Sequence, residues 1–216
     1  MGHSRKLLRR GKMLYEVGTL SKYFYIVLSG NVKVTGINKE GDEQIFGFFM
    51  PGDVLGLDTI YGQLRVNSAT ALDTTMIYQV PFPRLDGVVQ EQTELLSLIH
   101  KLVIDELSRN QSLRVLLCHG KAEDKVRWFL KDLSKRLSML GLSSTHVLLP
   151  VSRKEIANFL GLRVETVSRV FASLRKEGYI SISGRELVLQ EKLFSNLKTI
   201  HPAQTRKSMT MSSRII

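Results

Sequence analysis

The sequence predicts an α+β chain with three successive parts: an N-terminal antiparallel β-roll of the jelly-roll type, one long helix, and a C-terminal helical segment closed by a β-hairpin. Short runs of β-branched and aromatic residues alternate with turn signals in the first 80 residues. No Pro or Gly interrupts residues 92–117, and a capped helix, a glycine turn and an amphipathic helix follow Pro150. With 216 residues, 43% of them apolar, the chain can bury its cores without disulfides or metal ions.

The β-roll is predicted from composition and from spacing. Glycines at positions 18, 30, 41 and 52 recur at intervals of 12, 11 and 11 residues. Short strands with turns at this spacing favour an antiparallel barrel or jelly roll, and a generic β-sandwich is the alternative. The predicted strands are Tyr23–Leu28, Val32–Ile37, Gln44–Phe49 and Ala69–Val80.

The long helix, Gln92–Leu117, would measure about 40 Å at ~1.5 Å per residue, which is more than a small domain needs. Side chains that step alternately by four and three residues form a seam along it, as in a helix that pairs with a second copy of itself. We therefore expect a homodimer, and the alternative is an ordinary helix buried on two sides. The seam consists of Leu96, His100, Val103, Leu107, Asn110 and Arg114.

A second helix, Ala122–Leu140, precedes a helix-turn-helix pattern. Ser152 and Glu155 have the spacing of a capping box, and Gly161 can form the turn to the next helix, Val164–Glu177. The apolar residues of that helix lie on one face, which would pack inward. The opposite face carries Glu165, Ser168, Arg169, Ala172 and Lys176, a composition that suits a recognition helix in the major groove of DNA.

A predicted β-hairpin follows, with strands Tyr179–Ser183 and Glu186–Leu189, and it would form the wing of a winged helix. The net charge of +11 is concentrated in the same part of the chain. Residues 1–120 carry 13 Lys and Arg against 12 Asp and Glu, whereas residues 151–216 carry 12 against 5. A basic surface at a helix-turn-helix favours DNA binding, and a merely solvated charged surface is the alternative.

Several motifs resemble one known family. They are Ser152–Leu162 and Val164–Arg169 in the helix-turn-helix, and Gly41–Ile45, Gly47–Phe48, Gly52–Asp53 and Gly56–Asp58 in the β-roll. Over about residues 11–195 the chain resembles the CRP/FNR family of bacterial transcription regulators, in particular its FNR branch. We expect a β-roll sensor domain similar to cyclic-nucleotide-binding domains over residues 1–90, a dimerisation helix over 91–120, a winged helix-turn-helix over 121–195, and a flexible tail over 196–216.

The resemblance implies that Glu165, Ser168 and Arg169 read bases. Their chemistry agrees, because Arg can donate two hydrogen bonds to guanine, Glu can accept from cytosine and Ser suits several base edges. FNR-type regulators read an inverted repeat of the form TTGAT-N4-ATCAA, which is therefore the expected site. Contacts with phosphates are expected from Ser152, Arg153, Arg163 and Thr166, although the family usually has Thr or Ser at the position of Arg163.

The ligands of the family are not expected in this chain. An iron–sulfur cluster needs four thiolates as a rule, but the only cysteine is Cys118, and Tyr78 stands at the barrel position of the FNR cluster cysteine. Leu57 and Asn67 stand where CRP-like sites have the Glu and Arg that hold a cyclic nucleotide. We therefore expect no cofactor and no metal, and the effector stays unknown. A regulator that responds to a cyclic nucleotide, a thiol reaction or haem is the alternative.

Cys118 has two interpretations. It follows the long helix and precedes His119, so a neighbouring base could make it redox-reactive or allow a cross-link between protomers. A lone cysteine is more often a small buried hydrophobe, and the sequence favours this interpretation.

The sequence leaves two other classes of function to weigh. A metal-dependent jelly-roll enzyme would need histidines on the barrel strands, and none of the five lies there; the third class is a signalling module that binds a protein partner. As a regulator, the chain is expected to contact RNA polymerase, by resemblance, through the loop Asn38–Glu43. A basic N-terminus without an apolar run, and no apolar run of 18 residues, predict a cytoplasmic protein without membrane contact.

Overall fold

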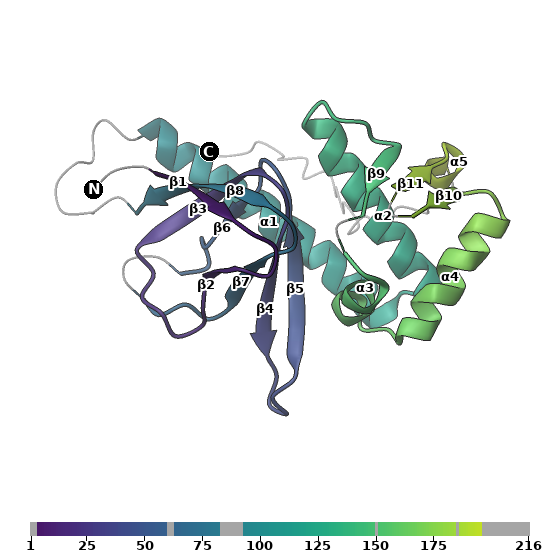
Figure 1. The fold of residues 1–216 in the computed structure, drawn as a ribbon, viewed down its shortest axis with the longest axis horizontal. Coiled ribbons are helices and arrows are strands. Elements are labelled where there is room, and N and C mark those ends of the chain that lie inside the picture. The colour runs from purple at the N-terminus through teal and green to yellow at the C-terminus, as the bar shows by residue number, and fades with distance from the viewer. Residues whose placement is uncertain (1–3, 60–62, 83–92, 150, 185, 196–216) are drawn as a thin grey trace, which may run out of the picture.

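The computed structural model describes residues 4–59, 63–82, 93–149, 151–184 and 186–195. A β-roll forms one end of the molecule and a helical part with a small sheet forms the other, while the long helix α1 runs behind the roll toward the helical part (Figure 1). The boundary predicted near residue 90 and the predicted tail 196–216 lie outside the described residues. In these ranges no helix has both the length and the apolar character needed to cross a membrane.

The predicted antiparallel β-roll is confirmed, as two four-stranded sheets with the orders β1-β8-β3-β6 and β2-β7-β4-β5. The strands are β1 Ser4–Leu8, β2 Met13–Tyr15, β3 Tyr23–Ser29, β4 Val32–Ile37, β5 Glu43–Phe49, β6 Val54–Leu55, β7 Ser68–Ala71 and β8 Thr75–Pro81. Their inward side chains form the core of the roll, in which Val27, Val32, Leu55 and Ile77 are at most 1% exposed.

Two details of the strand prediction are wrong. The single strand expected over residues 69–80 is two strands, because Leu72–Thr74 form a bend between β7 and β8, which lie in different sheets. The N-terminal residues were not expected to be strands, yet β1 pairs with β8 and β2 pairs with β7. Their partners lie some 60 residues further along the chain, so the local pattern holds little trace of the pairing.

Helix α1, Thr93–His119, is followed by α2, Ala122–Met139, close to the predicted ranges. Leu113 and Leu116 lie on the buried side of α1, and Leu113 packs in the molecule's own core. The opposite side is exposed and partly apolar: Ile104 is 60% exposed, Leu107 56% and Val115 46%. The helix therefore covers its own chain with one face and leaves an apolar face uncovered.

The winged helix-turn-helix is also confirmed. It consists of β9 His146–Leu148, α3 Arg153–Leu160, α4 Val164–Lys176, β10 Ile180–Ser183, β11 Glu186–Leu189 and α5 Lys192–Ser195, with the sheet order β10-β11-β9. The capping box is formed: the Glu155 amide donates to Ser152 Oγ at 3.2 Å, and the Ser152 amide donates to Glu155 Oε2 at 2.8 Å. Gly161 ends α3 in the left-handed conformation, with φ of 60°, and so sets the direction of α4.

Replacing Gly161 tests how far this turn determines the fold. A side chain at φ of 60° is strained even though a Cβ there would meet no atom within 4 Å, so Gly161→Ala should lower the free energy of unfolding by about 1–2 kcal/mol. Asn tolerates this conformation better, and Gly161→Asn should therefore cost less. Urea unfolding of the three proteins measures both effects. Equal stability of wild type and Gly161→Ala would contradict the prediction.

Candidate nucleic-acid interface

Helix α4 presents the three predicted base-reading residues to the surface. Val167, Phe171 and Leu174 are at most 2% exposed and anchor the helix in the core. Glu165, Ser168 and Arg169 are exposed on the other side, in the first two turns of the helix. Since the N-terminal turns of a recognition helix are those that reach base edges, the three side chains occupy suitable positions.

The outward face has little internal hydrogen bonding. Glu165 and Ser168 make no side-chain hydrogen bond with any described residue. Arg169 donates from Nη2 to the Thr166 hydroxyl at 3.4 Å, a long hydrogen bond between neighbours on one helix. Donors and acceptors on this face are therefore available to a ligand.

The predicted phosphate-contacting residues lie at the starts of the two helices. Ser152 caps α3 and is exposed. Arg163 is the N-cap residue of α4 and makes no capping hydrogen bond with its side chain, so it leaves first-turn amides of that helix uncapped. Uncapped amides at a helix start attract anions such as phosphate.

Arg153, like Thr166, is half-buried, whereas Ser152 and Arg163 are exposed. The guanidinium carbon of Arg153 lies 3.3 Å from the centroid of the Phe171 ring, which joins α3 to α4. Burial lowers the pKa of the Arg153 guanidinium, although the group stays charged at neutral pH. The side chain therefore has a packing role that the sequence analysis did not predict.

Hydrogen bonds of Asn158 on α3 connect the helix-turn-helix to the β-roll. Its Oδ1 accepts from the Ile45 amide at 2.6 Å, and its Nδ2 donates to the Glu43 carbonyl at 2.7 Å. In addition, Gln44 Nε2 donates to the Asn158 carbonyl at 2.9 Å. One asparagine side chain thus pairs with the backbone of β5 as a neighbouring strand would.

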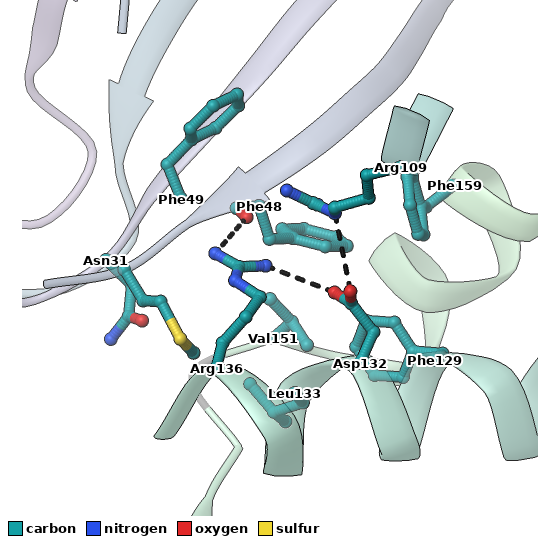
Figure 2. Close-up of a pocket in the computed structure, with 11 residues that line it drawn as sticks. Asn31, Phe48, Phe49, Arg109, Phe129, Asp132, Leu133, Arg136, Val151 and Phe159 are labelled. Carbon is teal, nitrogen blue, oxygen red and sulfur yellow. Dashed lines mark hydrogen bonds and ion pairs between the residues drawn. The ribbon is translucent and has the colours of Figure 1, made fainter. Parts of the chain in front are cut away.

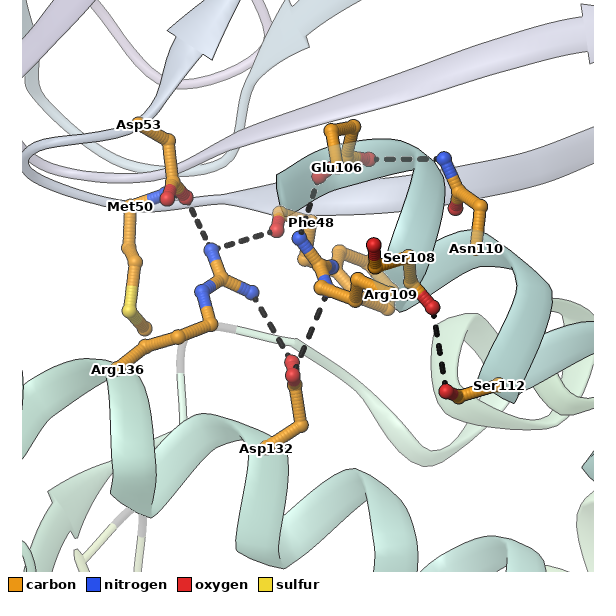
Figure 3. Close-up of polar contacts among 10 residues, drawn as sticks. All are labelled: Phe48, Met50, Asp53, Glu106, Ser108, Arg109, Asn110, Ser112, Asp132 and Arg136. Carbon is orange, nitrogen blue, oxygen red and sulfur yellow. Dashed lines mark hydrogen bonds and ion pairs between the residues drawn. The ribbon is translucent and has the colours of Figure 1, made fainter. Parts of the chain in front are cut away.

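A chain of charges joins three parts of the molecule beside this contact (Figure 3). Arg136 on α2 pairs with Asp53 of the β-roll and donates to the Phe48 carbonyl at 3.0 Å. Asp132, one turn earlier on α2, lies 3.3 Å from Arg136 Nη1 and 3.4 Å from Arg109 Nε of α1. The β-roll, α1 and α2 therefore share one network of ion pairs.

Aromatic rings fill the space next to the network (Figure 2). The Phe48 ring centroid lies 5.3 Å from that of Phe159 and 6.0 Å from that of Phe129, both in edge-to-face geometry. The cavity that remains among them has a volume of about 20 Å³, enough for one water molecule and no larger ligand. The space among these rings is therefore closely packed.

The sequence analysis did not identify the residues that join the β-roll to the helices. The sequence pattern assigns no role to Asn158, and none to Arg109, Asp132 or Arg136. A weak signal was present: Asp132 and Arg136 have the spacing of an ion pair on one helix turn.

The predicted seam residues of α1 have different surroundings. His100, Leu107 and Arg114 are exposed, whereas Val103 and Asn110 are half-buried, and Asn110 donates to Glu106 Oε1 at 3.1 Å. The side chain of Leu96 lies outside the described residues.

Cys118 is exposed, so its interpretation as a buried hydrophobe is wrong; it lies in the last turn of α1, on the solvent side. Among the described residues, no group of three His, Cys, Asp or Glu side chains is arranged to hold a metal ion.

Comparisons with known proteins agree with this architecture. Residues 5–92 match the model of the cyclic nucleotide-binding domain, and residues 124–193 match the Crp-like helix-turn-helix domain. The chain is 33% identical over 193 residues to Electron transport regulator A of Shewanella oneidensis. The matched region spans 89% of this chain and 77% of that protein. The chain belongs to the CRP/FNR family of DNA-binding transcription regulators.

Other members of the family support the same assignment. The Fumarate and nitrate reduction regulatory protein of Escherichia coli is 32% identical over 186 residues, which is 86% of this chain and 74% of that protein. The structure of FixK2 from Bradyrhizobium japonicum superposes with a TM-score of 0.79 at 27% identity, and it covers 90% of this chain and 97% of the other. The resemblance to the CRP/FNR family found in the sequence is confirmed.

Asn158→Ala tests the joint between the β-roll and α3. The change leaves the Ile45 amide and the Glu43 carbonyl without their partner, so we expect the free energy of unfolding to fall by about 1–3 kcal/mol. Lys154→Ala, an exposed change on the same helix, should stay within about 0.5 kcal/mol of wild type. Guanidinium chloride unfolding compares the three proteins, and equal losses in both variants would contradict this role of Asn158.

Proposed function

We propose that this CRP/FNR-family protein is a homodimer that binds an FNR-type inverted repeat, TTGAT-N4-ATCAA or a close variant. The observation that carries the proposal is the outward face of α4, where Glu165, Ser168 and Arg169 are exposed together in the first two turns. Arg169 suits the guanine of TTGAT with two donors, and Glu165 suits the amino group of a cytosine. Basic residues at the helix starts, such as Arg163, would hold phosphates and fix the position of α4.

The preference for the repeat rests on few side chains. Arg169→Ala should reduce the ratio of affinities for TTGAT-N4-ATCAA and for a repeat with its guanines replaced by about 5–150-fold, which corresponds to ~1–3 kcal/mol. Fluorescence anisotropy with labelled duplexes at a fixed salt concentration measures the ratio.

Arg175→Ala is the matched control, because it removes the same charge from the last turn of the same helix. It should weaken binding to both duplexes alike and keep the ratio. If Arg169→Ala keeps the wild-type ratio as well, the proposed base reading is wrong.

The homodimer would form through the exposed face of α1. Leu107 of the predicted seam lies on this face together with Ile104 and Val115, which are apolar, at helical spacing and not covered by the molecule's own core. A second copy of the chain could bury this face in a parallel helix pair, which would bring two α4 helices onto successive major grooves about 34 Å apart. This arrangement is supported because one face of the unbroken helix α1 is buried in its own chain and the opposite, exposed face is apolar.

Leu107→Glu tests the dimer. It places a charge on the uncovered apolar face without touching the buried face of α1, so it should raise the dimer dissociation constant by about 10–100-fold. Sedimentation equilibrium measures the constant. Ile37→Glu, a similar change at a residue 69% exposed on β4, should leave the constant unchanged. Unaltered dimerisation of Leu107→Glu, or equal weakening by both changes, would exclude this face.

Regulation would require no iron–sulfur cluster, because the chain has one cysteine and Tyr78 at the barrel position of the cluster. Activation would involve RNA polymerase at the turn between β4 and β5. Asn38 Oδ1 accepts from the Glu40 and Asp42 amides at 3.0 and 2.8 Å, so the turn has a defined shape. The hairpin projects beyond the roll in Figure 1, where a large partner can reach it.

A further inference from the structure

Arg65 is a cation in the interior of the β-roll. It precedes β7, and only 2% of its surface is exposed. The backbone at Gly18 and Thr19 holds it in place, because the Arg65 amide donates to the Thr19 carbonyl and the Gly18 amide donates to the Arg65 carbonyl, both at 2.8 Å. Burial of an ionised group is costly unless protein atoms replace its water. The surroundings of this guanidinium therefore need an explanation.

Oxygen atoms surround the edge of the guanidinium. Nη1 donates to the Gly56 carbonyl at 3.0 Å and to the Thr59 hydroxyl at 3.1 Å. Nη2 donates to the Tyr23 carbonyl, and Nη1 also lies 3.9 Å from Asp58 Oδ1. Three neutral acceptors and one carboxylate, spread around a planar fork, match a guanidinium better than a compact ammonium group.

Tyrosine rings cover the flat side of the same group. Its central carbon lies 4.3 Å from the Tyr15 ring centroid and 5.6 Å from that of Tyr25. The two rings are stacked at 5.6 Å with an interplanar angle of 20°. Burial raises the pKa of both phenols, so the rings stay neutral and interact with the cation through their π faces.

Gly56 provides the space that the guanidinium occupies. Its φ is +80°, and a Cβ at this position would lie 2.4 Å from Arg65 Nη1. The close approach lets the Gly56 carbonyl accept its hydrogen bond. The backbone is thus shaped around the arginine.

The residues of this roll do not fit a cyclic nucleotide, the ligand that its domain family implies. A buried phosphate needs a cationic partner. The position expected for that cation holds Asn67, whose Nδ2 donates to Asp58 Oδ2 at 2.7 Å. An anion of the chain itself therefore lies against Asn67, and the nearby cation Arg65 is already bonded to protein oxygens.

We propose that the β-roll contains an internal guanidinium site that Arg65 fills, in place of a site for an anionic effector. The oxygen atoms of Gly56, Thr59 and Tyr23 and the rings of Tyr15 and Tyr25 form the site. The roll reaches its final structure with its own side chain as the ligand. When that side chain is removed, the site takes up small guanidinium ions and discriminates against ammonium ions of equal charge.

Chemical rescue of Arg65→Ala tests the site. We expect the melting temperature of the variant to fall by about 5–15 °C. Methylguanidinium should restore at least half of this loss, whereas methylammonium at the same concentration should not, and neither should stabilise the wild type. Equal effects of the two ions on the variant, or no effect of either, would overturn the proposal.

Two further measurements remain informative if Arg65→Ala does not fold. Arg65→Lys keeps the charge and loses the planar fork, so it should be less stable than wild type, and equal stability would overturn the proposal. Cyclic AMP and cyclic GMP are then titrated into the wild-type protein and followed by calorimetry and melting temperature. We expect no saturable heat and no shift, whereas saturable binding of either nucleotide in the roll would show that Arg65 does not replace an effector.

Discussion

The edge-to-face packing of Phe48 against Phe129 and Phe159 makes one apolar core out of residues from the β-roll and the helix-turn-helix. Burial of apolar side chains brings these surfaces together, and the ion pairs around them then determine how the surfaces are oriented. Asp132 lies between Arg109 and Arg136 at the edge of this core, where separation of the parts would leave charges without partners. Because α4 packs in the same core as residues of the β-roll, its orientation relative to the roll is fixed.

Helix α1 connects this junction with the exposed apolar face on which we propose that a second copy binds. Arg109 points to the ion-pair network, while Leu107, two residues earlier, lies on the opposite, exposed side. A shift or rotation of α1 in a dimer would therefore act on Asp132 and, through α2, on the helix-turn-helix. The coupling between the two sites needs no chain of intermediate residues, because the rigid helix α1 carries both Arg109 and the exposed face with Leu107.

The elements with local signals could be predicted from the sequence. Ser152, Glu155 and Gly161 define the start and end of α3 within a few residues, and the one-sided apolar pattern of α4 separates its outward face. Contacts between distant segments leave no such pattern. Strand β1 and the interdomain role of Asn158 depend on residues more than 60 positions away. The burial of Arg65 could not be predicted, because the family pattern places a cation at position 67, whereas the buried cation is two residues earlier and turns inward.

The side chain of Asn158 forms hydrogen bonds with the backbone of β5 and not with its side chains. Every amino acid at position 43 offers the same carbonyl, and every residue except proline at position 45 offers the same amide. The exposed side chain of Glu43 can therefore change without loss of these hydrogen bonds, whereas Ile45 and Phe48 of β5 are held by their packing in the core. These hydrogen bonds depend on one asparagine side chain, so the turn between β4 and β5 can change in sequence without breaking them.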